Sequence, residues 1–172
     1  FVGETIEAIL VEDDMAEYVT GYISYIKNIQ GDHFYEEQVD FSEYAPDGFG
    51  SSDCLIFSGN TLHIIDLKYG RGEVVSAQNN TQGMLYALGA LNEYGMLYDI
   101  KTVVIHIYQP RVNNFSDWEI STTDLLKWGE WVKQRADEAL NDDAPRTAGE
   151  KQCRWCKAAP TCPTLKKYTE QV

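Results

Sequence analysis

The fold is decided by residues 50–68, which read GSSDCLIFSGNTLHIIDLK. Residues 52–58 and 61–69 are two runs rich in apolar and β-branched side chains, and Gly59-Asn60 stands between them. Two such runs joined by Gly-Asn are typical of a β-hairpin with a tight turn. The sequence therefore predicts an antiparallel hairpin at the centre of the fold.

Three charged residues lie in this apolar hairpin. Asp53 is on its first strand, and Asp66 and Lys68 are two residues apart on its second strand, so the latter two side chains share one face. Charged groups among residues such as Ile64 and Leu67 are costly unless something compensates them. A bound Mg²⁺ ion, which prefers oxygen ligands, would do so. The alternative is a buried Asp–Lys ion pair, with the second aspartate capping a turn.

The same three residues predict a chemistry. A metal ion held by two carboxylates can stabilise charge on a phosphate oxygen and lower the pKa of a bound water. Lys68 would orient or deprotonate that water, or neutralise the charge that develops on the phosphate. A lone D-x-K is common in proteins, so its position on a hairpin after G-x-x-D carries the argument.

Periodicity predicts the elements around the hairpin. We expect helices over 12–29, 76–94 and 122–140, and strands over 34–44 and 102–109. In the first of these strands, Tyr35, Glu37, Val39 and Phe41 alternate onto one side. The order helix, three strands, helix, strand, helix predicts an α/β fold with a mixed central sheet flanked by helices.

Charge is distributed unevenly along the chain, whose net charge is −13. Residues 1–50 hold one lysine against twelve acidic residues, whereas residues 146–172 hold six basic residues against two acidic ones. We expect one domain over 1–145 and a basic tail over 146–172. The pattern fits an enzyme that grips a phosphate backbone at one edge, or equally a solvated acidic surface with a basic terminus. No apolar run is long enough for a membrane helix, and the acidic start is unlike a signal peptide.

The tail carries three clustered cysteines, Cys153, Cys156 and Cys162, in a C-x2-C-x5-C pattern. Without a secretion signal, a disulfide framework is disfavoured, and a zinc or iron–sulfur site is the better interpretation. Three free thiols are the alternative. Cys54 follows Asp53 on a strand, so it should point away from the charged face and into the core.

Three motifs resemble those of a known family. Gly50-Ser51-Ser52-Asp53, then Ile64-Ile65-Asp66-Leu67-Lys68, then Gln82-Gly83-Met84-Leu85-Tyr86 resemble the G-x-x-D, (D/E)-x-K and Q-x-x-x-Y motifs of RecB-like PD-(D/E)xK nucleases. Residues 49–91 resemble a phage- and prophage-encoded exonuclease branch. Gln109-Pro110-Arg111 and the terminal cysteines are similar too, so the resemblance extends over nearly the whole chain.

The resemblance implies a restriction-endonuclease-like core and a set of site residues. Asp53 and Asp66 would bind Mg²⁺ or Mn²⁺ through their side chains, and Leu67 would do so through its carbonyl. Lys68 would be the catalytic lysine.

Three more residues are expected to support this site. Gln82 and Tyr86 stand one helical turn apart, so they face one groove, where they would place DNA or the lysine. By themselves they would form an ordinary polar stripe. Glu37, on the adjacent strand, is a further carboxylate that would contact the metal ligands rather than the metal itself.

The implied function is a metal-dependent exonuclease that hydrolyses phosphodiester bonds at DNA ends in phage recombination. It would act beside a single-strand annealing or recombination protein, in the cytoplasm of a bacterial host. The alternative is a non-catalytic DNA-binding or scaffold module that keeps the fold. A metal-thiolate redox protein is a weaker candidate because it leaves the charged hairpin unexplained.

Two expected ligands have no counterpart in this sequence. RecB-like members carry a His or Glu on an N-terminal helix, and a fourth cysteine that completes a [4Fe-4S] cluster. His63 does not fit, because its position along the strand is opposite in parity to that of Asp66. Three glutamates near the start are alternatives by position alone: Glu4, Glu7 and Glu17. We expect the missing ligands upstream of Phe1, so that the N-terminal helix and the cluster are incomplete in this fragment.

Overall fold

The computed structural model describes residues 2–6 and 9–171. The chain divides into two compact units, Phe1–Lys133 and Gln134–Val172. The division falls inside helix α3 (Thr122–Ala139) rather than at the predicted boundary after residue 145. The reason is packing, since α3 contacts the core through Leu125, Trp128 and Val132, all before the division.

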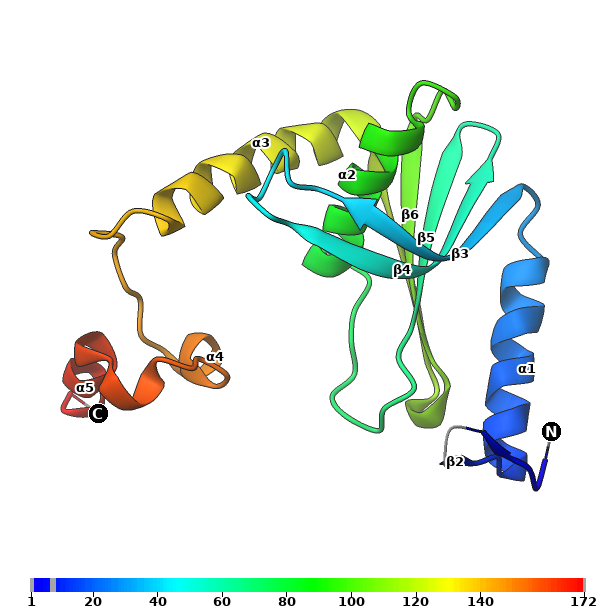
Figure 1. The fold of residues 1–172 in the computed structure, drawn as a ribbon, viewed down its shortest axis with the longest axis horizontal. Helices are drawn as coiled ribbons and strands as arrows, with labels where there is room; N and C mark the ends of the chain where they lie inside the picture. The colour runs from blue at the N-terminus through cyan, green and yellow to red at the C-terminus, as the bar shows by residue number, and fades with distance from the viewer. Residues whose placement is uncertain (1, 7–8, 172) are drawn as a thin grey trace. The chain divides into compact units, whose positions relative to one another are not determined.

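A five-stranded mixed sheet forms the centre of the first unit (Figure 1). Its strands stand in chain order: β3 (Asp32–Asp40), β4 (Phe49–Ser58), β5 (Thr61–Leu67), β6 (Thr102–Gln109) and β7 (Asn114–Ser121). Only β5 and β6 are parallel, and the other three pairs are antiparallel. The predicted hairpin is β4–β5, and Gly59 takes the positive φ of 59° that its turn requires.

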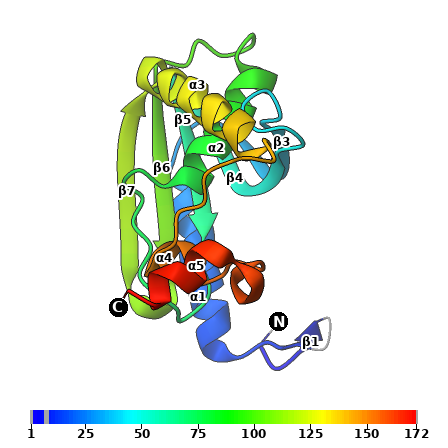
Figure 2. The ribbon, with the colours of Figure 1, turned by 90° about the vertical axis from the view of Figure 1, so that its left-hand side faces the viewer.

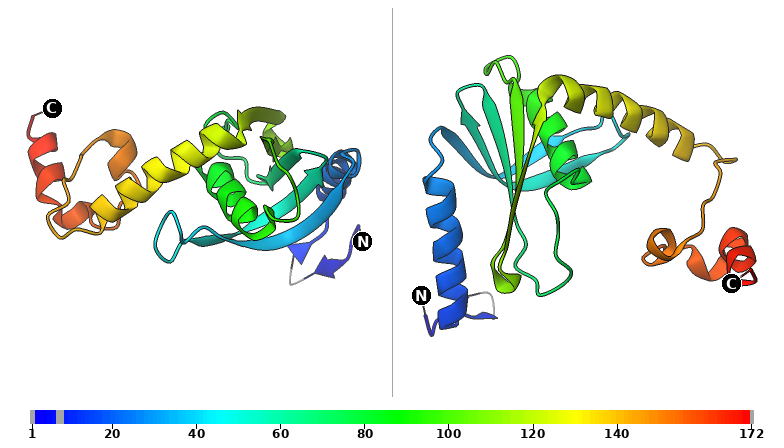
Figure 3. Two further views of the ribbon diagram at one scale, coloured as in Figure 1. Left: turned by 90° about the horizontal axis from the view of Figure 1, so that it is seen from above. Right: turned by 180° about the vertical axis from the view of Figure 1, so that it is seen from behind.

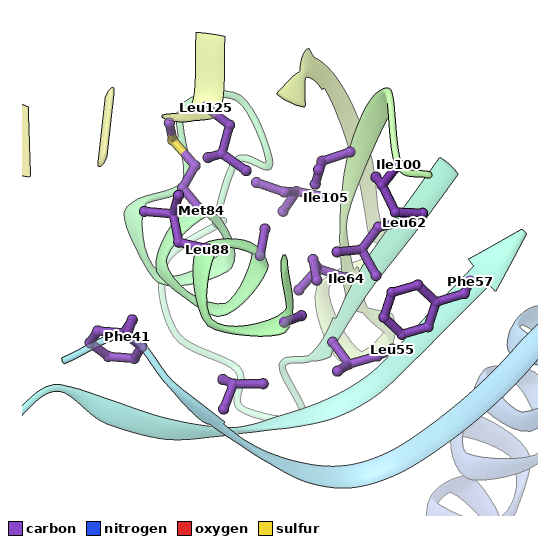
Figure 4. Packing of buried hydrophobic residues seen from close by; sticks show 14 of the residues in the cluster. Phe41, Leu55, Phe57, Leu62, Ile64, Met84, Leu88, Ile100, Ile105 and Leu125 are labelled. Carbon is purple, nitrogen blue, oxygen red and sulfur yellow. The ribbon is translucent and has the colours of Figure 1, made fainter. Parts of the chain in front are cut away.

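Helices cover both faces of this sheet, as the views in Figure 3 show. Helix α1 (Asp13–Lys27) packs on one face through Ile26, against buried Cys54, Ile56 and Ile65. Helix α2 (Thr81–Tyr94) and the first turns of α3 pack on the other face, where the larger core lies (Figure 4). The mixed α/β fold with a sheet flanked by helices is therefore confirmed.

The core around α2 is built from alternate residues of the central strands. Leu55, Ile64 and Ile105 are fully buried and face Met84 and Leu88 of α2 (Figure 4). Full burial of such a side chain contributes roughly 1.5–3 kcal/mol. Each strand therefore has one side turned to α2 and the other turned away from it. This alternation decides on which side of the sheet the charged side chains lie.

One strand was not predicted, and its position explains why. In β7, half-buried and exposed residues alternate strictly, as expected at an edge with one face in solvent. Figure 2 shows β7 beside β6 along this edge. On the half-buried side of β7, Trp118 and Ile120 are the apolar residues that pack against the core. The alternation of apolar and polar residues is therefore weak in the sequence of this strand.

Two predicted elements differ most from the observed ones, by four residues or more at one end. The strand predicted over 34–44 ends at Asp40, whose carboxylate accepts the backbone N–H of Ser42 at 2.7 Å and starts a turn. The helix predicted over 76–94 begins at Thr81, because the side chain of Asn80 caps it by accepting the Gly83 N–H at 2.9 Å.

The prediction of which β3 side chains share one side of the sheet is wrong in part. Tyr35 is exposed, whereas Phe34, Glu37 and Val39 are turned to the α2 side. The alternation shifts by one residue at Glu36, which has a positive φ of 51°.

Short elements complete the chain. The strands β1 (Thr5–Ile6) and β2 (Ile9–Leu10) pair before α1. The second unit contains α4 (Glu150–Cys153), the 3₁₀ turn η2 (Ala159–Thr161) and α5 (Pro163–Thr169). Within the residues that the structure describes, no helix combines the length and apolar character needed to cross a membrane.

Candidate functional site

The two aspartates of the hairpin lie where the pairing of β4 with β5 ends. Cys54 and Ile65 form the last pair, so Asp53 and Asp66 are the next two opposite positions. Beyond this point β4 continues with β3 and bends away from β5 (Figure 1). The Oδ2 atom of Asp53 accepts the backbone N–H of Leu67 at 2.7 Å, which replaces the partner that this N–H loses when the ladder ends.

Asp53 and Asp66 are therefore like charges held face to face. Asp66 is only 7% exposed, and Asp53 is half-buried. Burial raises the pKa of Asp53, and the neighbouring Asp66 and Glu36 charges add to the rise, whereas the hydrogen bond from Leu67 opposes it. Carboxylates paired in this way are unfavourable in the folded chain unless a cation compensates them.

Lys68 provides one cation at this site. It follows β5 directly, and its Nζ lies 2.8 Å from Oδ2 and 3.1 Å from Oδ1 of Asp66. Nζ also donates to Oε1 of Gln82 at 2.8 Å, and Nε2 of Gln82 donates to the Tyr86 hydroxyl at 3.1 Å. Helix α2 thus holds the lysine through a chain of hydrogen bonds that begins at Tyr86.

The glycine of the G-x-x-D motif has a physical role in this arrangement. A Cβ atom at Gly50 would lie 2.5 Å from the ring of Tyr86, which no side chain tolerates. Only glycine at this position lets the Tyr86 ring reach β4. Gly50, from the G-x-x-D motif, therefore permits the close contact of β4 with Tyr86, from the Q-x-x-x-Y motif.

The donor set at the end of the hairpin fits a divalent metal. The Oδ2 atom of Asp66 is buried and accepts no directional hydrogen bond from the described residues, although Lys68 Nζ is close. Two carboxylates opposite each other are oxygen donors of the kind that Mg²⁺ uses. Among residues 2–6 and 9–171, no group of three or more His, Cys, Asp or Glu side chains is placed to share one ion, so the side-chain donors here are the two aspartates.

Glu37 lies elsewhere on the α2 face. Its Oε1 accepts the hydroxyl of Tyr94, near the end of α2, at 2.7 Å. The glutamate whose charge acts on Asp53 is its neighbour, Glu36. Glu36 stands at the irregular position of β3, and nothing in the sequence marked that irregularity.

Tyr22 of α1 is a second residue that the sequence did not single out, because at helical spacing it fits an ordinary apolar face. Its hydroxyl is buried and has no hydrogen-bond partner among the described residues. Burial raises the pKa of this hydroxyl, and the nearby Cys54, Asp53 and Asp66 add to the rise. Tyr22 therefore approaches the acidic pair from the α1 side.

The remaining candidates for a metal ligand lie apart from the pair. His63 is on the α1 face, as predicted, where its Nδ1 is hydrogen-bonded to Nε2 of His106 at 2.9 Å. Cys54 is fully buried in the same face and behaves as a core residue, also as predicted. Glu17 is exposed on α1, and Glu7 lies outside the described residues.

The loop between Lys68 and α2 is fastened to β6 and β7 by polar side chains. Buried Gln109 accepts the Val75 N–H at 3.1 Å and donates to the Glu73 carbonyl at 3.0 Å. Asn114 donates to the Val75 carbonyl at 2.8 Å, and Ser116 accepts the Ala77 N–H at 3.0 Å. Gln109 therefore acts as a positioning residue for the loop that joins the lysine to its helix.

The three tail cysteines line one cavity of about 480 Å³ in the second unit. The N–H groups of Leu165 and Thr164, together with Arg146, lower the pKa of Cys162. The donors suit zinc or an iron–sulfur cluster in kind, but as placed the described thiols do not converge on one point. The predicted thiolate site at Cys153, Cys156 and Cys162 stays a prediction.

Comparison with known proteins places the chain in a family. The model of DUF2800, a family of proteins of unknown function, matches residues 4–172, nearly the whole chain. The crystal structure of SSO0001 is similar at a TM-score of 0.40 and 15% identity, over 87% of this chain and 68% of that one. A TM-score this low carries no argument, and the family description names no activity.

Proposed function

The chain belongs to the DUF2800 family, and we propose that it is a divalent-metal-dependent DNA nuclease. The observation that carries this proposal is the pair of carboxylates at the end of the β4–β5 ladder. Asp53 and Asp66 stand opposite each other, and Lys68 Nζ lies 2.8 Å from Oδ2 of Asp66. Two carboxylates and a lysine are the groups that metal-assisted phosphodiester hydrolysis uses.

The roles of the side chains follow from their contacts. Asp53 and Asp66 would hold Mg²⁺ or Mn²⁺, with the Leu67 carbonyl as the further ligand that the RecB-like resemblance implies. When bound, the ion would stabilise charge on a phosphate oxygen and acidify a water. Lys68, held 2.8 Å from Asp66, would add a positive charge where negative charge develops on the phosphate.

Gln82 and Tyr86 act on the lysine rather than on the substrate. Because Nε2 of Gln82 donates to Tyr86, the oxygen of the same amide is directed to Lys68. This fixes the ammonium at one place instead of leaving a flexible side chain in solvent. Positioning of this kind is worth a large part of the rate in hydrolytic enzymes.

The substrate and setting come from the resemblance of residues 49–91 and of the basic tail. Acting at DNA ends, the enzyme would be an exonuclease of phage recombination, beside a single-strand annealing or recombination protein in the bacterial cytoplasm. An iron–sulfur cluster or zinc ion is proposed for the three tail cysteines.

The test is degradation of linear duplex DNA with Mg²⁺, Mn²⁺ or EDTA. We expect metal-dependent degradation that falls roughly 10²–10³-fold in Asp66→Asn and in Lys68→Gln, since each removes one charge from the reacting centre. Matched controls are Glu119→Gln and Lys101→Gln, which alter exposed charges on β7 and at the start of β6. Wild-type rates in both site variants would refute the proposal.

The second candidate is a non-catalytic DNA-binding or scaffold module. It is favoured by the side-chain donor set, which among the described residues consists of two aspartates and no third acid or histidine. Calorimetry with Mn²⁺ and thermal melting separate the two candidates. A nuclease should bind Mn²⁺ and gain stability from it, and Asp53→Asn should lose that gain. DNA binding without any Mn²⁺ binding would support the scaffold module instead.

A further inference from the structure

Arg111 lies over one aromatic ring, which a second ring contacts edge-on. It lies in the 3₁₀ turn η1 (Pro110–Val112) that follows β6, and it is half-buried. Its guanidinium carbon stands over the ring of Tyr69 at 4.9 Å from the centroid. The ring of Tyr18, from α1, meets Tyr69 edge-on with centroids 6.2 Å apart. A cation–π contact of this kind orients a guanidinium and leaves its N–H edge available.

The position of Arg111 relative to Lys68 follows from strand direction. Strands β5 and β6 are parallel, and Leu67 stands opposite Tyr108. Strands β5 and β6 finish at the same end of the sheet (Figure 1), so Lys68 and Tyr69, which follow β5, and Arg111, which follows β6, lie at that end. Consecutive side chains alternate, so Tyr69 and Arg111 lie on the α1 side, where Tyr69 meets Tyr18, whereas Lys68 lies on the α2 side. In sheets with parallel strands, ligands bind outside the carboxyl ends of those strands. Arg111 therefore stands at the same end of the sheet as the candidate site, on the α1 side.

Among the described residues, the charge of Arg111 has no acidic partner. Lys68, Lys101 and Lys127 each form an ion pair with an aspartate, whereas no acidic side chain of the described residues pairs with Arg111. Its Nε is buried and makes no hydrogen bond with them. A buried donor without a partner is unfavourable in the folded chain. In a chain of net charge −13, such a guanidinium fits an anion that arrives from outside.

We propose that Arg111, oriented by Tyr69, binds a backbone phosphate of the DNA strand that enters the site beside Lys68. A planar guanidinium offers two parallel N–H groups, which match two oxygens of a phosphodiester. Binding through the exposed part of the guanidinium would give its charge a partner and place a positive charge at the same end of the sheet as Lys68. This inference rests on the proposed nuclease function, because it assigns the adjacent phosphate of that substrate.

The experiment measures DNA affinity over a series of salt concentrations. Fluorescence anisotropy of a labelled oligonucleotide in EDTA gives the Kd without turnover. We expect Arg111→Ala to raise the Kd about tenfold at moderate salt and to reduce the salt-dependence slope by about one, as the loss of one phosphate contact requires. Lys101→Ala is the matched control, since it removes one exposed positive charge at the opposite end of β6 and should leave the slope unchanged.

Further variants keep the test decisive if the alanine variant fails to fold. Arg111→Lys preserves the charge, so the slope should stay while the Kd rises several-fold. Tyr69→Leu removes the supporting ring without changing charge and should also raise the Kd several-fold. An Arg111→Lys protein with the wild-type Kd, or equal losses in Arg111→Ala and Lys101→Ala, would overturn the assignment.

The outcomes also separate this inference from the nuclease proposal. Wild-type protein that binds DNA with an Arg111-dependent slope but never cleaves it would refute the nuclease and support the phosphate contact. Cleavage by the wild type, with unchanged binding in Arg111→Ala, would refute the phosphate contact alone. Protein that does not bind DNA at all would refute both.

Discussion

Acidification should weaken the folded state through one buried histidine. His106 lies on β6 and is 7% exposed. Its side chain is on the α1 side of the sheet, where it forms two hydrogen bonds. Its Nδ1 is bonded to the Tyr25 hydroxyl at 2.8 Å, and its Nε2 to Nδ1 of His63 at 2.9 Å. Burial, reinforced by the neighbouring His63, lowers the pKa of His106 to about 4. Protonation of His106 therefore opposes folding.

The size of the effect follows from that pKa. The ordinary histidine pKa of 6.5 falls to about 4 in the folded chain, and each pKa unit corresponds to about 1.4 kcal/mol, so the full loss is about 3 kcal/mol. The unfolded chain binds the proton first, so the stabilisation is complete above pH 6.5 and disappears as the pH falls to about 4. Burial also lowers the pKa of His63, which adds to this loss. The raised pKa of Asp53 has the opposite sign and favours folding at acid pH.

Urea unfolding at a series of pH values in EDTA measures this effect. The free energy of unfolding of the wild type should fall between pH 6.5 and 4 more steeply than that of His106→Gln, because the variant lacks the titrating ring. His33→Gln, a histidine of β3 outside the pair, is the matched control. Parallel curves for the wild type and His106→Gln would refute the reasoning, as would a His106 ring that titrates near 6.5 by NMR.

Two further predictions concern helix α2. Gln82→Ala should lower kcat roughly tenfold or more in single-turnover cleavage while leaving the DNA Kd unchanged, because Lys68 loses the acceptor at 2.8 Å; Tyr86→Phe should have a smaller effect, and equal kcat in Gln82→Ala and wild type would contradict the positioning role. Gly83→Ala should lower the free energy of unfolding by about 1–3 kcal/mol, because the new Cβ would lie 2.6 Å from the Ile105 side chain. Thermal melting measures that loss, and an unchanged Tm would show that the helix can shift freely.

The sequence by itself determined what depends on spacing within one element. Alternation along a strand places Asp66 and Ile64 on one side and His63 on the other, and the structure confirms this. The same rule predicted that the Cys54 side chain points into the core, where it is fully buried. The Gly59 turn was predicted for a related reason, because only a few residues adopt the positive φ of a tight hairpin.

Tertiary structure alone decided which elements meet. No local pattern reveals that β4 bends away from β5 at Asp53, that Glu36 shifts the alternation of β3, or that Arg111 lies on Tyr69. Contact between Lys68 and Gln82 depends on the placement of a helix against a sheet, which the packing of the whole core sets. Periodicity fixes the direction of a side chain within its own element, whereas its partners come from elements distant in sequence, and only their packing brings them together.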